Sequence, residues 1–205
     1  MNQEEIWNEI AVHWKEFRTK ISPTVEKFLR EKKGRVLDIG CGSGRNFIKI
    51  KGLKWFGIDF SKKMLDYAKI SAKNKGINIE LKKSDSVKIP YEDNYFNYVL
   101  CYAVLHCVDS DKKREETIKE IYRVLKPKSQ ALISVWGKNS PRLRSKEKEC
   151  FVPWTVKEKT KINRYTYIYD KKELEEIVEN IGFKILKSWE ERNINLIIQK
   201  DLHKS

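Results

Sequence analysis

The fold of this chain is decided by the stretch Val36-Leu37-Asp38-Ile39-Gly40-Cys41-Gly42-Ser43-Gly44-Arg45-Asn46. An apolar strand ends in an acid, and a turn with glycine at every second position follows. Glycine has no Cβ, so the backbone can turn sharply there and approach a ligand closely. Nineteen residues beyond Gly40, the stretch Trp55-Phe56-Gly57-Ile58-Asp59 also ends in an acid, which suits the two hydroxyls of a ribose. Together these features predict a site for a nucleotide-type cofactor.

The glycine spacing separates this turn from a dinucleotide-binding turn. A dinucleotide fold reads G-x-G-x-x-G and then opens a helix whose N-terminus binds a pyrophosphate. This chain reads G-x-G-x-G, and Asp38 directly before it is better placed for a cationic amino-acid group than for a pyrophosphate. The competing interpretation is a tight strand–helix turn with no ligand, which the matching intervals to Asp59 and Asp85 disfavour.

The pattern resembles the S-adenosylmethionine turn of class I methyltransferases. The resemblance implies that the glycines line the methionine part, that Asp59 holds the ribose, and that Asp85, after a third short strand, contacts the adenine. It implies S-adenosyl-L-methionine as cofactor, S-adenosyl-L-homocysteine as product, and no metal. The residues that it assigns to the cofactor are Asp38, Gly40, Gly42, Gly44, Asn46, Asp59, Phe60, Asp85, Ser86 and Tyr102.

Length and composition suit one α/β domain. The chain has 205 residues, of which 40% are hydrophobic, and no apolar run approaches the ~20 residues of a membrane span. The N-terminal residues 1–5 are polar and acidic, unlike a secretory signal. The four cysteines show neither C-x-x-C spacing nor a metal pattern, which favours a reduced, cytoplasmic protein. They are Cys41, Cys101, Cys107 and Cys150.

The net charge of +14 comes from 43 Lys and Arg against 29 Asp and Glu. Such an excess indicates a polyanionic partner, nucleic acid first and an anionic membrane surface second. The competing interpretation is a lysine-biased composition from genome bias or a hot habitat.

Periodicity and turn signals predict alternating strands and helices, hence a mostly parallel sheet with helices on both faces. The predicted strands are Arg35–Ile39, Lys54–Asp59, Ile79–Lys83, Phe96–Tyr102, Ala131–Trp136, Lys184–Trp189 and Ile194–Gln199. The predicted helices are Glu5–Leu29, interrupted at Pro23, then Asn46–Lys51, Lys62–Asn74, Lys112–Leu125 and 170–180. With the class I resemblance, which makes the last two strands an antiparallel hairpin, this is a seven-stranded Rossmann-like fold. We expect a single domain over 1–205, with a helical segment at 1–30.

A basic insert interrupts the pattern at residues 137–164. Its part from 138 to 164 holds nine Lys and Arg against three Glu and shows no clear period. It follows the fifth strand at the carboxyl edge of the sheet, where ligands bind in such folds. We therefore expect it to bring a phosphate backbone to the cofactor; the alternative is a disordered, solvated loop.

Further segments resemble the tRNA wobble-uridine methyltransferases of the Trm9 and AlkB homologue 8 type. The matching segments are Ile10–Lys20, Val104-Leu105-His106 with Arg114, Leu125-Lys126-Pro127, Ala131–Trp136, Phe151-Val152-Pro153-Trp154 and Arg164-Tyr165-Thr166-Tyr167. The chain departs from the family pattern where Cys107, Lys128-Ser129 and Thr166-Tyr167 replace a histidine, a glycine pair and a Tyr-His pair. The departures affect the substrate side and leave the cofactor motifs intact.

The resemblance implies that the acceptor is the carboxymethyl group on C5 of the wobble uridine (U34), methylated to its ester. A carboxylate is already ionised at neutral pH, so no general base is expected, and catalysis rests on positioning and desolvation. Arg18, His106 and Arg164 are the candidates for orienting the carboxylate, with packing or exposed roles as alternatives. Trp154, Tyr165, Lys146 and Lys148 are the candidates for binding tRNA. The implied partners are tRNA and a small zinc-binding activator of the Trm112 type, with no membrane.

Two other functions share the cofactor motifs. A methyltransferase for a small carboxylic acid or quinone precursor would need neither the charge nor the basic insert. A catalytically silent nucleic-acid-binding protein would not need the intact Asp38, Asp59 and glycines.

Overall fold

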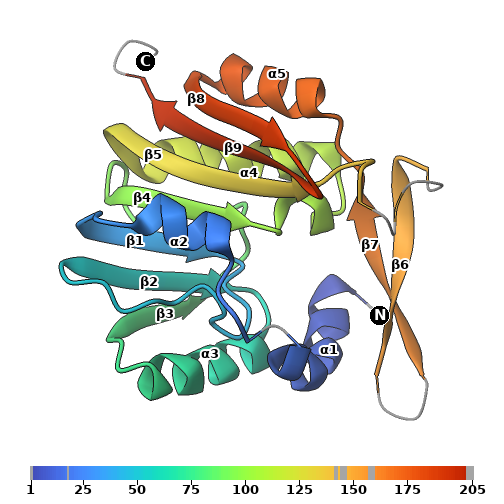
Figure 1. Ribbon diagram of the computed structural model, residues 1–205. Helices are drawn as coiled ribbons and strands as arrows, with labels where there is room; N and C mark the ends of the chain where they lie inside the picture. Colours follow the sequence, from blue (N-terminus) through green and yellow to red (C-terminus); the bar gives the residue numbers. More distant parts are fainter. Residues whose placement is uncertain (1, 18, 141–142, 144–146, 157–159, 202–205) are drawn as a thin grey trace.

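A computed structural model describes the chain except residues 1, 18, 141–142, 144–146, 157–159 and 202–205. A seven-stranded sheet in the order β3-β2-β1-β4-β5-β9-β8 forms its centre (Figure 1). The strands are β1 (Gly34–Ile39), β2 (Leu53–Asp59), β3 (Ile79–Lys83), β4 (Phe96–Tyr102), β5 (Leu125–Trp136), β8 (Phe183–Glu190) and β9 (Asn193–Lys200). The helices are α1 (Gln3–Phe17), α2 (Pro23–Leu29), α3 (Lys62–Asn74), η1 (Leu105–Cys107), α4 (Asp111–Val124) and α5 (Lys171–Ile181).

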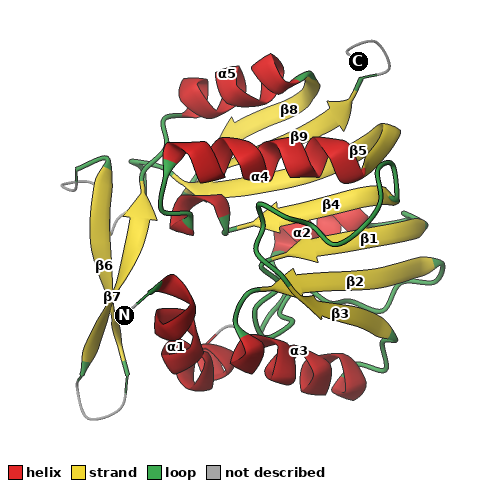
Figure 2. Ribbon diagram, turned by 180° about the vertical axis from the view of Figure 1, so that it is seen from behind, coloured by secondary structure: helices red, strands yellow, loops and turns green. Residues whose placement is uncertain are grey.

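Helices cover both faces of the sheet (Figures 1 and 2). Side chains of α4 and α5 pack on one face, and side chains of α2 and α3 pack on the other. Because successive residues of a strand point to opposite faces, Leu37 and Ile39 join the first core while Val36 joins the second. A strand buried on both faces reads as a continuous apolar run, which is why β1 was recognisable in the sequence.

The sheet is parallel from β3 to β5, and β9 and β8 close it antiparallel. The strand order reverses between β1 and β4, so the loops after these two strands diverge and leave a crevice at their carboxyl ends. This is the Rossmann-like architecture that the sequence predicted. Among the described residues, none of the helices is both long and apolar enough to cross a membrane.

Two of the predicted helices differ from those observed. The prediction of a helix over Asn46–Lys51 was wrong: residues 42–46 form turns, and no helix lies between β1 and β2, which already begins at Leu53. The predicted helix Glu5–Leu29 is two helices, α1 and α2, because Pro23 begins α2 at a position that suits its fixed φ.

The basic insert contains regular structure although its sequence shows no clear period. Its described part contains the strands β6 (Glu149–Thr155) and β7 (Lys161–Tyr167), which form an antiparallel hairpin beside the sheet (Figure 2). Ile162 of β7 packs in one cluster with Ile6 and Ile10 of α1. Both faces of β7 are largely covered, so an alternation of apolar and polar residues does not show in its sequence.

Candidate active site

A cavity of about 1040 Å³ lies at the carboxyl ends of the parallel strands. The turn after β1, the ends of β2 and β4, η1, and the turn between β8 and β9 form its base, and α1 and β7 contribute side chains from the other side. Its lining residues are Trp7, Trp14, Lys20, Ile21, Ser22, Pro23, Thr24, Gly40, Cys41, Gly42, Arg45, Asn46, Asp59, Phe60, Met64, Tyr102, Ala103, Val104, His106, Cys107, Trp136, Ser140, Arg164, Glu191, Arg192, Asn193 and Asn195. The predicted glycine turn therefore lines a cavity at the topological switch point of the sheet.

The glycine turn is built from positive φ angles at Gly40 (+57°), Gly42 (+54°) and Gly44 (+78°). A Cβ on Gly40 would lie 2.6 Å from a methyl group of Val104, so the close approach there excludes any side chain. A Cβ on Gly42 would instead lie 3.6 Å from Trp14 Nε1, at the wall of the cavity. Gly42 thus leaves open a cradle that a larger residue would occupy.

Asp59 at the end of β2 is tied to this turn. Its Oδ2 accepts a hydrogen bond from Gly42 N (2.9 Å), and its Oδ1 accepts one from Ser61 N (2.9 Å). Burial raises its pKa to about 6, and the two backbone donors oppose the shift. Each carboxylate oxygen keeps a further lone pair, so the group can still accept from two ribose hydroxyls.

Asp38, at the opposite side of the turn, is 1% exposed. Asn46 Nδ2 lies 3.5 Å from its Oδ2, and burial raises its pKa to about 7 although the Arg45 charge opposes the shift. Among the described residues, Asn46 Oδ1 has no hydrogen-bond partner. A buried carboxylate with so little compensation suits a cationic ligand group, which would stabilise its ionised form.

The structure does not bring every predicted cofactor residue to the cavity. Gly40, Gly42, Asn46, Asp59, Phe60 and Tyr102 line it, whereas Asp38, Gly44, Asp85 and Ser86 are absent from its lining. Asp38 reaches the cavity only through Asn46, whose Nδ2 lies 3.5 Å from the Asp38 Oδ2.

Asp85 Oδ1 closes its own turn by accepting from Val87 N (3.3 Å). Ser86 Oγ shares a hydrogen bond with Thr117 Oγ1 (2.9 Å) on α4. These two side chains hold the loop to itself and to α4.

On the acceptor side, Arg164 of β7 is buried (3% exposed) among four indole rings. Its guanidinium carbon lies 5.1–5.8 Å from the ring centroids of Trp7, Trp14, Trp136 and Trp154. Such contacts stabilise a cation in a site with little water. The site therefore places a buried positive charge in a cavity wall.

His106 of η1 lies beside this arginine and is equally buried (2% exposed). Its ring stacks on Trp136 with centroids 4.6 Å apart and an interplanar angle of 18°. Burial, together with the Arg164 charge, lowers its pKa to about 3, so the imidazole is neutral at physiological pH. The ring lines the cavity, and its Nδ1 is buried without a hydrogen-bond partner among the described residues.

The predicted substrate residues are spread over different places. Trp154 packs on Trp14 (centroids 5.0 Å apart) behind the cavity wall. Tyr165 accepts a hydrogen bond from Arg114 of α4 (2.9 Å). Lys148 pairs with Glu173 of α5 (3.0 Å), away from the cavity. Arg18 and Lys146 lie outside the described residues.

Sequence reasoning missed several cavity residues. Trp7 was not singled out and Trp14 entered only within the matching segment Ile10–Lys20, although two indoles seven residues apart lie on one helix face. The residues 191–195 at the turn between β8 and β9 carry no motif, and only the antiparallel closure of the sheet brings them to the site.

Comparison with known proteins relates the chain to methyltransferases. A family profile described as "Methyltransferase domain" matches residues 36–128. The tRNA (carboxymethyluridine(34)-5-O)-methyltransferase of Schizosaccharomyces pombe is 30% identical over 92% of this chain and 91% of its own length. A SAM-dependent methyltransferase from Methanosarcina mazei has a similar structure (TM-score 0.71, 26% identity), covering 90% of this chain and all of that one. A Haloferax volcanii methyltransferase, solved with the Trm112 methyltransferase activator, shares the fold (TM-score 0.70, 15% identity, 95% of this chain and 97% of that one).

A sheet with this strand order and a glycine cradle between two buried acids defines an S-adenosylmethionine site. The chain belongs to the class I S-adenosylmethionine-dependent methyltransferases, among relatives of the Trm9 and AlkB homologue 8 type. We propose that Asp38, next to the lining residue Asn46, stabilises the ammonium group of the cofactor and that Asp59 holds its ribose, while Gly42 leaves room beside it.

Proposed function

We propose that the protein methylates the carboxymethyl group on C5 of the wobble uridine of tRNA to its methyl ester. The observation that carries the proposal is the buried Arg164 guanidinium in the wall of the donor cavity. Arginine is cationic at every physiological pH and offers donors in a planar fork that matches a carboxylate. A buried arginine therefore selects an anionic acceptor over a neutral hydroxyl or amine.

The surrounding groups are consistent with a reaction that needs no general base. S-adenosylmethionine, when bound, supplies an electrophilic methyl group. A carboxylate acceptor is ionised already, and His106, with a pKa of about 3, is too weak a base to be needed or useful at pH 7. We infer that Arg164 orients the acceptor, that His106 contributes a neutral hydrogen-bonding edge, and that the indoles exclude water and strengthen the charge contact.

The surface supports a nucleic-acid substrate. The net charge is +14, and Phe17, 69% exposed, lies edge-on against Trp154 with centroids 5.9 Å apart. An exposed aromatic ring such as Phe17 offers a stacking surface to unpaired bases such as those of an anticodon loop. The name of the fission-yeast relative supports the same substrate.

We also propose a small zinc-binding activator of the Trm112 type as partner. The supporting observation is the shared fold with the Haloferax volcanii methyltransferase, whose structure contains such an activator. The chain expressed alone should be poorly soluble or weakly active, and co-expression with the activator should change that. Full solubility and full activity of the chain alone would contradict this partner.

The central experiment measures transfer of a labelled methyl group to tRNA that carries wobble carboxymethyluridine, with and without alkaline treatment. Alkali-labile label supports a methyl ester. Alkali-stable label would move the acceptor to a base or ribose atom. No label in tRNA, even with an activator present, would favour the small-molecule alternative, a carboxylate or quinone precursor.

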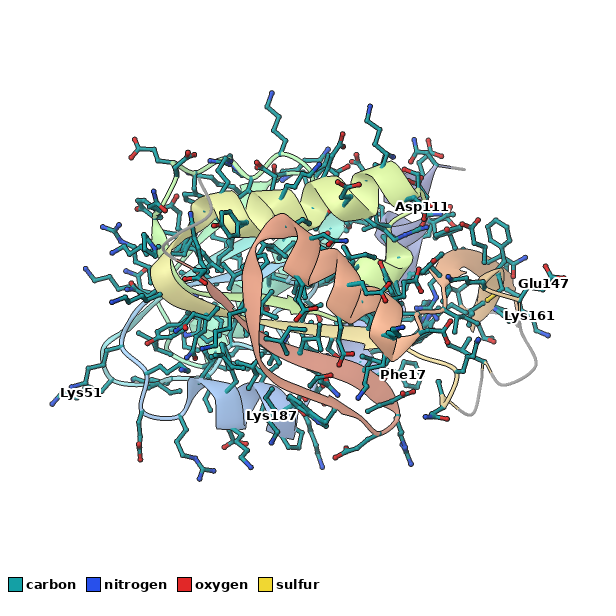
Figure 3. All side chains as sticks on the ribbon, turned by 90° about the horizontal axis from the view of Figure 1, so that it is seen from above. Phe17, Lys51, Asp111, Glu147, Lys161 and Lys187 are labelled. Carbon is teal, nitrogen blue, oxygen red and sulfur yellow. The ribbon has the colours of Figure 1, made fainter. Side chains whose placement is uncertain are left out.

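Arg164→Gln tests the residue that carries the proposal. We expect kcat/KM for tRNA to fall at least 100-fold, because a charge-assisted bidentate contact is lost, while the Kd for S-adenosylmethionine stays within about threefold. Lys161→Gln is the matched control: it removes a positive charge from the exposed start of the same strand (Figure 3) and should leave kcat unchanged. Equal activity of Arg164→Gln and the wild type would overturn the role of Arg164.

A further inference from the structure

The glycine turn is held from outside by two side chains of α3. Lys75 Nζ donates to Gly44 O (2.9 Å) and to Arg45 O (3.2 Å), and Ser71 Oγ donates to Gly44 O (3.2 Å). Lys75 lies at the C-cap of α3 and is partly buried, so its cation is directed at the turn from beneath the cofactor cradle.

These contacts take the place of a helix after the glycine turn, which this fold lacks. Where a helix follows a glycine turn, each backbone N–H group of the helix donates a hydrogen bond to the carbonyl group four residues earlier. Here the segment after Asn46 is not helical, and Phe47 N reaches only Gly44 O, at 3.3 Å. Gly44 O therefore receives Phe47 N, Ser71 Oγ and Lys75 Nζ, and Lys75 also donates to Arg45 O. A carbonyl group that loses such a donor costs free energy and leaves the backbone free to shift.

We propose that Lys75, assisted by Ser71, is a positioning residue for the methyl-donor site: it fixes the glycine turn in place of the missing helix. The same cation supports the carboxylate that receives the ammonium group of the cofactor. Lys75 does not line the cavity, so it acts through the turn and through its charge.

The charges that face Asp38 show how Lys75 acts on it. Arg45 and Lys75 lower the pKa of Asp38, whereas Asp59 raises it, and the neighbouring Cys41 and Cys101 are buried thiols whose own pKa values are raised. Removing the Lys75 charge therefore disfavours the carboxylate form of Asp38, the form that the cofactor needs.

Binding of S-adenosylmethionine by calorimetry tests the positioning role. Lys75→Gln should raise the Kd roughly five- to thirtyfold, the loss of one to two charge-assisted hydrogen bonds. Ser71→Ala should raise it about two- to fivefold, and Lys75→Arg should restore most of the affinity. The control Lys73→Gln removes an exposed charge from the same turn of α3 and should bind as the wild type. A Kd for Lys75→Gln within twofold of the wild type would overturn the proposal.

Titration of the Asp38 carboxyl carbon by NMR in the ligand-free protein separates positioning from simple stabilisation. Lys75→Gln should move the Asp38 midpoint to higher pH, and Lys75→Arg and Lys73→Gln should not. Weaker binding with an unmoved midpoint would reduce Lys75 to a packing residue and contradict its electrostatic role. If Lys75→Gln does not fold, Ser71→Ala decides, because unchanged binding there would refute the clamp.

Discussion

At the residue scale, the donor site keeps two carboxyl groups in surroundings that disfavour their charge. Burial raises the pKa of Asp38 from 3.8 to about 7. The folded state therefore binds this proton more tightly than the unfolded chain does, and stability falls as the pH rises from about 4 to 7. The ligand's positive charge offsets this cost, so the site is less stable without its cofactor than with it.

Asp38→Asn should separate stability from binding. The neutral amide removes a cost on the order of 2–4 kcal/mol at pH 8, so the melting temperature should rise there and change little near pH 4. Binding of S-adenosylmethionine should weaken at least tenfold, because the counter-charge is gone. Thermal unfolding at both pH values and calorimetry measure the two effects; a stabilisation equal at pH 4 and pH 8 would contradict this account.

Gly42→Ala and Gly76→Ala form a matched pair. Both glycines have positive φ, +54° and +62°, and in both places a new Cβ meets its nearest neighbour at 3.5–3.6 Å. Each variant should lose about 1–2 kcal/mol of unfolding free energy from the left-handed backbone alone. Only Gly42→Ala should weaken S-adenosylmethionine binding, because its methyl group would occupy the cradle. Equal affinity of the two variants would mean that the cofactor does not approach Gly42.

At the element scale, the hairpin β6–β7 is fastened to the main sheet layer by Arg114 of α4. Its Nη1 donates to Val108 O (2.8 Å) and to Tyr165 OH (2.9 Å), and its guanidinium lies 3.8 Å from the centroid of the Tyr167 ring. The buried Arg114 thus connects α4 to β7, the strand that carries Arg164. It therefore fixes the position of Arg164 relative to the glycine turn after β1.

Arg114→Gln should loosen the hairpin without affecting the donor site. We expect a loss of about 2–3 kcal/mol, because a buried Tyr165 hydroxyl loses a charged partner and the ring of Tyr167 loses its cation. The KM for the acceptor should rise, and the Kd for S-adenosylmethionine should stay within twofold. Lys113→Gln, which breaks an exposed pair with Asp109, should cost under about 0.5 kcal/mol. An unchanged acceptor KM in Arg114→Gln would mean that the hairpin does not depend on this contact.

Some elements of this fold could be predicted from the sequence alone, and others could not. The strands β1 and β2 were predictable because each is an apolar run that ends at glycine or at an acid, a pattern visible in the local sequence. β4 was predictable from its apolar run Phe96–Tyr102 alone. The absence of a helix after Asn46 depends on where β2 starts, which local propensity does not report. The enclosure around Arg164 joins Trp7, Trp14, Trp136 and Trp154, which meet only in the folded chain. Asp85 and Ser86 follow β3 at the interval that the family resemblance implies, but their side chains form hydrogen bonds within the loop and to α4.

At the scale of the whole molecule, the net charge of +14 should govern affinity for tRNA more than for the cofactor. Each phosphate neutralised by a Lys or Arg releases counterions, so log Kd for tRNA should rise linearly with log salt, with a slope of several units. S-adenosylmethionine is expected to meet the buried acids Asp38 and Asp59, and buried charges are screened little by salt, so its Kd should change little over the same range. Filter binding of tRNA and calorimetry of the cofactor from 50 to 300 mM salt, on the order of physiological strength, measure both. A slope near zero for log Kd of tRNA against log salt would assign the lysine excess to composition bias and favour a small acceptor. A steep slope for tRNA, with a Kd for S-adenosylmethionine that does not change, would mean that tRNA binds to lysines and arginines outside the donor cavity.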